Sequence, residues 1–220
     1  MATGMTAFEQ EVASVRDGLV EMASVVLTQI ERSVAAWEAT DGSLAAEVIS
    51  ADDEVDDACI TLDEQIFHIQ LLNSPVAGDQ RLLHVGLIAA IALERVGDLA
   101  VAISQLAGSV PVGGAVPEVE ARIQKMSARA IDMLARAVQA IARGDVALAE
   151  TVRSDAQRVA ELLEELLGVV AQKQEDPASR EWAAAAVLVG RHLERVSNNA
   201  RELAGRVPFL VDGQSFRRGR

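Results

Sequence analysis

The chain has 220 residues, half of which are hydrophobic, and its 33 Asp and Glu outnumber its 20 Lys and Arg, which gives a formal net charge of −13. This length and hydrophobic content allow a sizeable buried core and are not those of a disordered polypeptide, whereas the negative charge argues against nucleic acid and anionic lipid as partners. The single cysteine, Cys59, excludes a disulfide framework within one chain and, with a start that lacks the features of a signal peptide, favours a cytoplasmic protein.

Long segments with apolar residues every three or four positions follow one another along the chain, separated by short breaks rich in Gly, Pro, Asp and Ser. We expect helices over residues 6–40, 44–72, 79–107, 118–143, 146–173 and 179–206, the last of them ended by Pro208. Asp79 is expected at the N-cap or in the first turn of the third helix. No segment shows the alternation of a strand, so we predict an all-α fold whose short connections make neighbouring helices antiparallel.

The apolar run 82–107 is long enough to suggest a transmembrane helix, but Glu94, Arg95 and Asp98 lie within it. Charged side chains are costly at the centre of a bilayer. We therefore expect this segment to be a buried helix of a helical bundle.

Two blocks of sequence recur in the second half of the chain. Leu93–Ala100 reads LERVGDLA, and Leu193–Ala200, 100 positions later, reads LERVSNNA. At an offset of 104, four more residues of the first half recur: Leu44, Val48, Ser50 and Val55 match Leu148, Val152, Ser154 and Val159. This order indicates a duplicated three-helix unit. It predicts a first repeat over residues 1–107, a linker over 108–117, a second repeat over 118–207 and a flexible, Arg-rich tail over 208–220.

Two pairs of acidic residues four positions apart mark the first repeat. Asp52 and Asp56 lie in the second helical segment, Glu94 and Asp98 lie in the third, and residues i and i+4 share one face of a helix. If these helices are antiparallel neighbours, the four carboxylates converge on a patch that suits a divalent cation with oxygen ligands. Plainer interpretations stay open, because the run 52–57 also fits a solvated helix face, and Glu94 and Asp98 also fit an ion pair with Arg95 or with another basic residue.

The second half keeps only one of these carboxylates. At the two offsets the four acids align with Ala156, Ala160, Glu194 and Asn198. We therefore expect a metal site in the first repeat and at most a weak one at Glu194 and Asn198.

The other chemistry-bearing residues give weaker signals. His68, His84 and His192 lack metal-ligand spacing, and the chain has neither a ferritin-type Glu-x-x-His pair nor a glycine-rich phosphate loop. Trp37 and Trp182 are predicted to be packing residues.

Three of these stretches together resemble the PhoU family of phosphate-signalling regulators. Glu94–Asp98 resembles the repeated ERIGD signature of the family, Ser74–Arg81 resembles its QPxAxDLR segment, and Val48–Asp56 resembles its VI..D..ID pattern. The resemblance extends over nearly the whole chain, from Phe8 to Arg206.

The resemblance implies two tandem antiparallel three-helix bundles and a cytoplasmic regulator rather than an enzyme, held at the inner face of the membrane only through its partners. It implies a negative regulator of the phosphate-starvation response and of phosphate uptake, an adaptor between the ATPase subunit of the phosphate ABC transporter and a sensor histidine kinase. It is compatible with a homodimer. It also implies divalent or trivalent metal ions (Fe, Zn, Mn or Mg) at acidic pairs, which correspond here to Asp52, Asp56, Glu94 and Asp98.

An alternative from another class is a carboxylate-bridged metal enzyme or a metal store on a helical bundle. The converging acids of the first repeat favour it. The lack of His ligands, of an evident base or nucleophile, and of a matching second repeat disfavours it.

Overall fold

The computed structural model describes residues 5–172 and 176–213. These residues form seven α-helices and no strand. The helices are α1 Ala7–Ala39, α2 Gly42–Ser50, α3 Asp52–Asn73, α4 Ala77–Ser109, α5 Pro117–Arg143, α6 Val146–Val170 and α7 Pro177–Asp212. The all-α prediction is confirmed.

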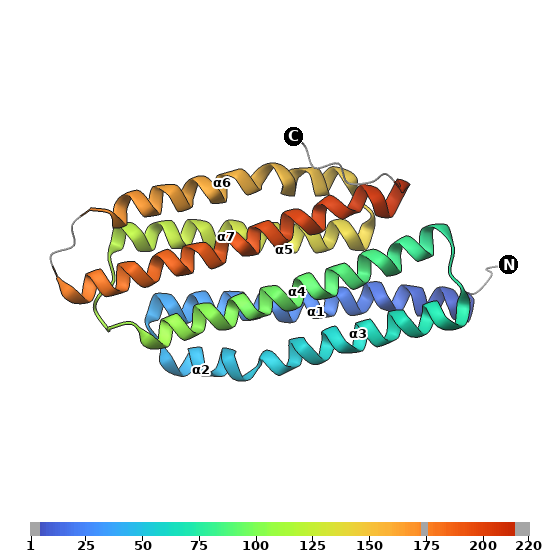
Figure 1. Cartoon of the computed structure of the whole chain (residues 1–220), viewed down its shortest axis with the longest axis horizontal. Helices are drawn as coiled ribbons and strands as arrows, with labels where there is room; N and C mark the ends of the chain where they lie inside the picture. Colours follow the sequence, from blue (N-terminus) through green and yellow to red (C-terminus); the bar gives the residue numbers. More distant parts are fainter. Residues whose placement is uncertain (1–4, 173–175, 214–220) are drawn as a thin grey trace.

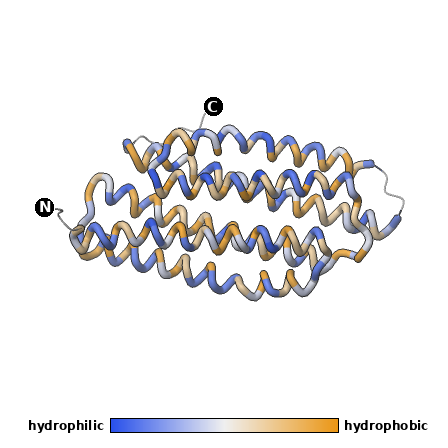
Figure 2. Tube along the Cα trace, turned by 180° about the vertical axis from the view of Figure 1, so that it is seen from behind, coloured by the Kyte–Doolittle hydropathy of each residue, from blue (hydrophilic) through white to orange (hydrophobic). Residues whose placement is uncertain are grey.

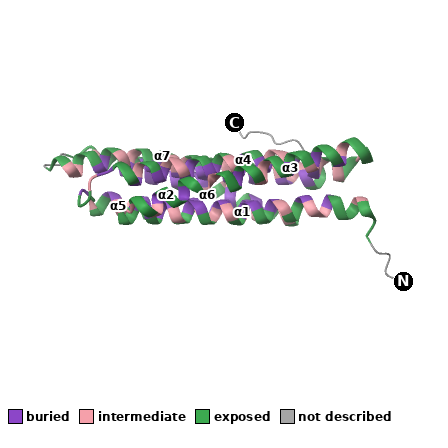
Figure 3. Cartoon of the chain, turned by 90° about the horizontal axis from the view of Figure 1, so that it is seen from below, coloured by how far each residue is buried: buried purple, intermediate pink, exposed green. Residues whose placement is uncertain are grey.

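The helices form an elongated bundle of two repeats (Figure 1). The first repeat contains α1, α4 and the broken arm α2–α3, and the second contains α5, α6 and α7. The repeats meet where α4 packs on α7 and α1 packs on α5, so the α2–α3 arm and α6 lie on opposite outer sides. Seen from below, α4 and α7 lie in one row and α1 and α5 in the other, with buried residues mainly between the rows (Figure 3).

Side-chain caps explain where several helices begin. Thr6 and Glu9 form a capping box at α1, in which the Glu9 amide donates to Thr6 Oγ1 at 3.2 Å and the Thr6 amide donates to Glu9 Oε2 at 2.8 Å. Asp41 and Asp145 stand at equivalent places in the two repeats, and each accepts hydrogen bonds from the first turn of the next helix. Val76 occupies the N-cap of α4, which places Asp79 in its first turn, as expected.

The predicted single helix over 44–72 is wrong, because the chain breaks at Ala51. Ala51 leaves helical geometry (φ −89°, ψ 1°), and the Ser50 hydroxyl bonds back to the Glu47 carbonyl at 2.9 Å. As a result Asp52, with the two acids that follow it, lies in the first turn of α3. Carboxylates are favoured there by the helix dipole, whereas mid-helix they would only repel one another.

The prediction that Pro208 ends the last helix is also wrong. Helix α7 continues through Pro208 to Asp212 and ends at Gly213 in left-handed geometry (φ 72°). Arg81, in the first turns of α4, holds this extension: its Nε and Nη2 donate to the carbonyls of Leu210 and Val211, both at 3.2 Å. The terminal arginines of the predicted tail, and Lys173 at the predicted end of α6, lie outside the described residues.

The core is built almost entirely from aliphatic side chains, and hydrophilic and hydrophobic residues alternate along each helix (Figure 2). Trp37 of α1 and Trp182 of α7 are fully buried and stack at a ring-centroid distance of 5.0 Å, so both are packing residues between the repeats, as predicted. None of the helices within the described ranges has the length and apolar character needed to cross a bilayer.

Candidate carboxylate site on the first repeat

The four predicted carboxylates come from two helices that pack side by side. Asp52 and Asp56 lie in the first two turns of α3, and Glu94 and Asp98 lie in the middle of α4. Asp52 and Glu94 are half-buried, whereas Asp56 and Asp98 are exposed. Although α4 is buried on most sides, Asp98 therefore belongs to its solvent-facing strip.

The pKa shifts of Asp52 and Glu94 indicate that these four side chains lie near one another. Burial raises the pKa of Asp52, and the negative charges of Asp56 and Asp98 raise it further, against a hydrogen bond from Gln29 that lowers it. Burial likewise raises the pKa of Glu94, followed by the charges of Asp98 and Asp56, against the opposing charge of Arg95. The four carboxylates thus lie close enough to repel one another. We call these four side chains the carboxylate patch.

Helix α1 adds a polar group to the patch. Gln29 is 5 % exposed, and its Nε2 donates to Asp52 Oδ1 at 3.4 Å, while its Oε1 is buried without a hydrogen-bond partner. Gly97 on α4 gives both side chains their space. A Cβ at position 97 would lie 3.3 Å from Asp52 Oδ1 and 3.3 Å from Gln29 Oε1.

Within the described residues the patch has no ion-pair partner. None of its four acids takes part in an ion pair with any residue in the described ranges, Arg95 included. The alternative of an ion pair with Arg95 is therefore not what the structure shows. The solvated-face interpretation holds for Asp53, Glu54 and Asp57, which are exposed on α3.

The donor set suits a hard cation, but the side chains are not gathered into a coordination site. No three His, Cys, Asp or Glu side chains among residues 5–172 and 176–213 are arranged to hold a metal ion. The patch supplies only oxygen donors, from four carboxylates and the free amide oxygen of Gln29, which suit Mg²⁺ or Mn²⁺. A bound cation would require the exposed carboxylates to swing inward.

The second repeat lacks the corresponding features. Gln29 aligns with Met133 at the 104-residue offset, and Met133 is fully buried. Glu194, the one carboxylate retained, pairs with Arg191 at 2.8 Å, and Asn198 is exposed. Ala156 is buried in the core.

The sequence did not identify Gln29 and Gly97 as parts of the patch. A signal existed for Gln29, because it is a polar residue on the mostly apolar inner face of α1, between Val26 and Ile30. Gly97 differs from Ser197, its counterpart in the second repeat, but only the structure shows that Asp52 and Gln29 occupy the space a side chain would need.

Comparison with known proteins places both repeats in one family. The model of the PhoU domain matches residues 19–107 and 123–207. A relative from Pseudomonas putida, named as a phosphate-specific transport system accessory protein PhoU homolog, is 29 % identical over 211 residues, which cover 96 % of this chain and 82 % of the relative.

Solved structures agree with this assignment. The crystal structure of PhoU from Pseudomonas aeruginosa matches with a TM-score of 0.86 and 28 % identity, covering 94 % of this chain and all of the other. The Streptococcus pneumoniae phosphate transport system regulatory protein PhoU also matches with a TM-score of 0.86, and at 17 % identity it supports the fold alone.

Proposed function

This chain belongs to the PhoU family, and on that premise we propose that it is a regulator of phosphate transport that restrains phosphate uptake and the phosphate-starvation response. The observation that carries the proposal is that both repeats match the PhoU domain and that the whole fold matches a PhoU crystal structure over 94 % of the chain. The names of the relatives associate those proteins with the phosphate-specific transport system.

We propose further that the chain acts by docking rather than by catalysis. In this role it links the ATPase subunit of the phosphate transporter to a sensor histidine kinase at the inner face of the membrane. A bundle with a rigid aliphatic core and a strongly charged outer helix supports such a role, because it offers a surface of fixed shape and charge to a partner.

The carboxylate patch is proposed to bind a divalent cation. Support comes from the mutual repulsion of the four acids, from the lack of an ion-pair partner among the described residues, and from the unpartnered oxygen of Gln29. A bound cation would supply positive charge that offsets the repulsion. The residues of this chain would hold it, with Asp52 kept in place by Gln29 while Asp56, Glu94 and Asp98 close around the ion.

A reporter of the phosphate-starvation response tests the regulatory role. In a strain that lacks this gene and is grown in excess phosphate, alkaline phosphatase activity should be high, and the wild-type gene should return it to a low level. Unchanged activity in the deletion strain, or a failure of the wild-type gene to lower it, would overturn the proposal.

Calorimetric titration with Mn²⁺, Mg²⁺, Zn²⁺ and Fe²⁺ tests the patch separately. The double variant Glu94→Ala/Asp98→Ala should bind at least tenfold more weakly than the wild type, whereas Glu194→Ala, in the second repeat, should bind like the wild type. Equal losses in the two variants, or no binding by the wild type, would refute a cation site confined to the first repeat.

A further inference from the structure

The outer side of α3 carries large apolar side chains that no other described residue of the chain covers. Ile60, Phe67 and Leu71 are 56 %, 63 % and 66 % exposed, and they are spaced seven and four residues apart. Along a helix this spacing forms one stripe. The buried residues of α3, among them Leu62 and Ile66, lie on the opposite side against α1 and α4.

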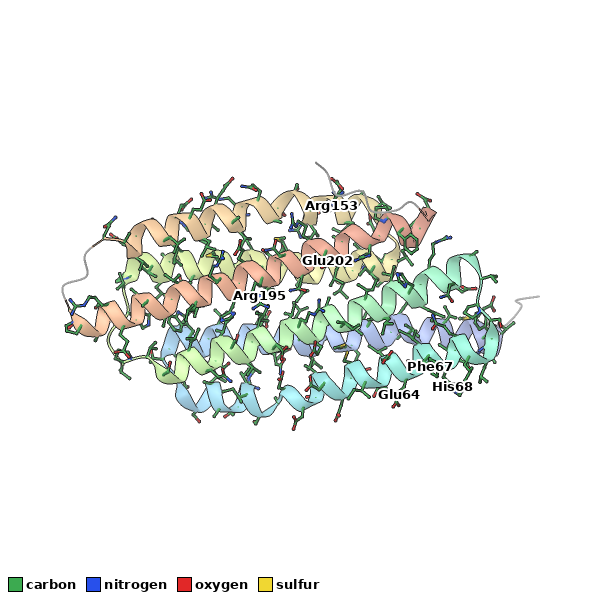
Figure 4. All side chains as sticks on the ribbon, viewed as in Figure 1. Glu64, Phe67, His68, Arg153, Arg195 and Glu202 are labelled. Atoms are coloured by element: carbon green, nitrogen blue, oxygen red, sulfur yellow. The ribbon has the colours of Figure 1, made fainter. Side chains whose placement is uncertain are left out.

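Carboxylates border this stripe on both sides. At 100° per residue, Asp63 lies beside the stripe on one edge, and Asp57 and Glu64 lie beside it on the other. All three are exposed. Glu64 and Phe67 are labelled in Figure 4 along the C-terminal half of α3, at the outer edge of the first repeat. We call the stripe and these three carboxylates the α3 face.

The segment of the chain that contains the α3 face carries formal charges of one sign only. Residues 33–80 contain eleven Asp and Glu and no Lys or Arg, so this segment accounts for −11 of the net charge of −13. None of the carboxylates of α3 forms an ion pair within the described parts of the chain.

Helix α6, the outer helix of the second repeat, lacks the apolar stripe of α3, so the stripe is not a general feature of outer helices in this fold. Ile60 and Phe67 align at the 104-residue offset with Glu164 and Ala171. Helix α6 also carries its own cations: Arg158 pairs with Glu161 at 2.9 Å. The duplicate therefore has neither the apolar stripe nor the uncompensated charge.

We propose that the α3 face is a docking surface for a basic amphipathic helix of a partner protein. This inference rests on the proposed adaptor role and assigns a surface to it. Apolar side chains of the partner helix would cover Ile60, Phe67 and Leu71, and flanking Lys or Arg would meet the carboxylates on both edges. The two helices would then pair along their apolar stripes, with anchors of the partner helix at i, i+3 or i+4, and i+7.

Charge favours this occupant over two others. A second copy docked through the same face would bring one acidic α3 against another, and like charges placed across an interface oppose association. An anionic membrane surface would repel the segment for the same reason. A basic helix is the occupant whose charge is complementary to the face.

The test uses purified full-length protein and a fluorescent synthetic peptide of eighteen residues, with Leu on one helical face and Lys on both flanks. Two control peptides keep its length, one with Glu in place of Lys and one with Ser in place of Leu. Fluorescence anisotropy should show saturable binding of the first peptide only, weakened about tenfold between low and high salt because exposed charges are screened.

Surface variants then locate the binding site. Phe67→Ser/Leu71→Ser should weaken binding about tenfold or more, since buried anchors dominate such interfaces. The matched control Leu167→Ser/Leu188→Ser replaces two other exposed leucines, on α6 and α7, and should bind like the wild type. Asp57→Asn/Asp63→Asn/Glu64→Gln should also weaken binding, whereas Asp17→Asn/Glu21→Gln/Glu31→Gln, which removes as many exposed acids from α1, should not.

Three outcomes would overturn the inference. They are failure of the first peptide to bind, equal binding by the α3-face variants and their controls, and a dimer of the wild type that Phe67→Ser/Leu71→Ser converts to a monomer in sedimentation. Circular dichroism of each variant identifies loss of folding. The phosphatase reporter separates this inference from the proposed function. If the wild-type gene represses the phosphatase but the α3-face variants bind the peptide like the wild type, the proposed function stands and the docking surface is refuted.

Discussion

Replacing Gly97 with alanine probes how closely α4 approaches the carboxylate patch. The added Cβ would lie 3.2 Å from Val55 Cγ1 and 3.3 Å from both Asp52 Oδ1 and Gln29 Oε1. Contacts this short on three sides force α3 or the two polar side chains to move by a few tenths of an ångström. Overpacking of a tight site costs about 1–3 kcal/mol, whereas alanine gains about 1 kcal/mol over glycine in a helix.

A second glycine separates these two effects. A Cβ at Gly168 on α6 would meet nothing within 4 Å, so Gly168→Ala should show the helix-propensity gain alone, about 1 kcal/mol of added stability. Gly97→Ala should fall about 1–3 kcal/mol below Gly168→Ala in its free energy of unfolding. Urea titrations followed by circular dichroism at 222 nm measure both variants on the same scale.

The same substitution should weaken cation binding at the patch. Asp52 and Gln29 are the two polar groups that the new methyl group displaces, and we expect about a tenfold loss of affinity, the order seen when a group supporting a metal ligand is disturbed. Gly168→Ala should leave the affinity unchanged. Equal stabilisation by the two substitutions, together with unchanged cation binding, would refute the close approach of α4 to Asp52 and Gln29.

Three further measurements test other parts of the structure. Arg81→Ala should lower the free energy of unfolding by about 1–2 kcal/mol, because the last turn of α7 loses two charged hydrogen-bond donors, and amide exchange should accelerate over residues 208–212 but not in α6. The raised pKa values mean that Asp52 and Glu94 bind protons more tightly when folded, so their contribution favours folding below about pH 4 and is lost as pH rises. Asp52→Asn/Glu94→Gln should therefore be more stable than the wild type at pH 7, on the order of 0.5 kcal/mol. This gain should disappear near pH 3.5, and a gain that does not depend on pH would contradict the raised pKa values. Trp182→Ala should cost about 3–5 kcal/mol in thermal or urea unfolding, Trp182→Phe should cost clearly less, and equal small losses would show that the stacked ring is not a packing element.

Much of the fold could be predicted because the chain marks its helix ends with local chemistry. Asp41, Asp145 and Asp176 each cap a helix at a break that composition alone reveals. The two errors differ in origin. The break at Ala51 accompanies a local hydrogen bond from the Ser50 hydroxyl to the Glu47 carbonyl. The helix that continues through Pro208 is held by tertiary contacts from Arg81, and intrinsic propensity is a weak guide where such contacts decide.

The candidate site could be predicted only in part. Spacing of four residues identifies helical faces, so the convergence of Asp52 and Asp56 with Glu94 and Asp98 follows once α3 and α4 are known to be neighbours. The part played by Gln29 depends on how α1 is rotated against α3. That rotation is set by packing of the whole core, and the position of Gln29 between Val26 and Ile30 does not by itself reveal which helix its amide meets.

The linker between the repeats has a mechanical consequence for signalling. A Cβ at Gly114 would lie only 2.7 Å from the Ala178 carbonyl oxygen and 3.0 Å from the Trp182 Cβ, so the linker is pressed against the start of α7. At the other end of the molecule Arg81 of α4 donates hydrogen bonds to the last turn of the same helix. Helix α7 is therefore held at one end by the linker and at the other by α4, and contacts at both ends of one long helix oppose a hinge motion between the repeats. Two proteins bound to the two repeats would then be held at a nearly constant distance and angle, as by a stiff spacer.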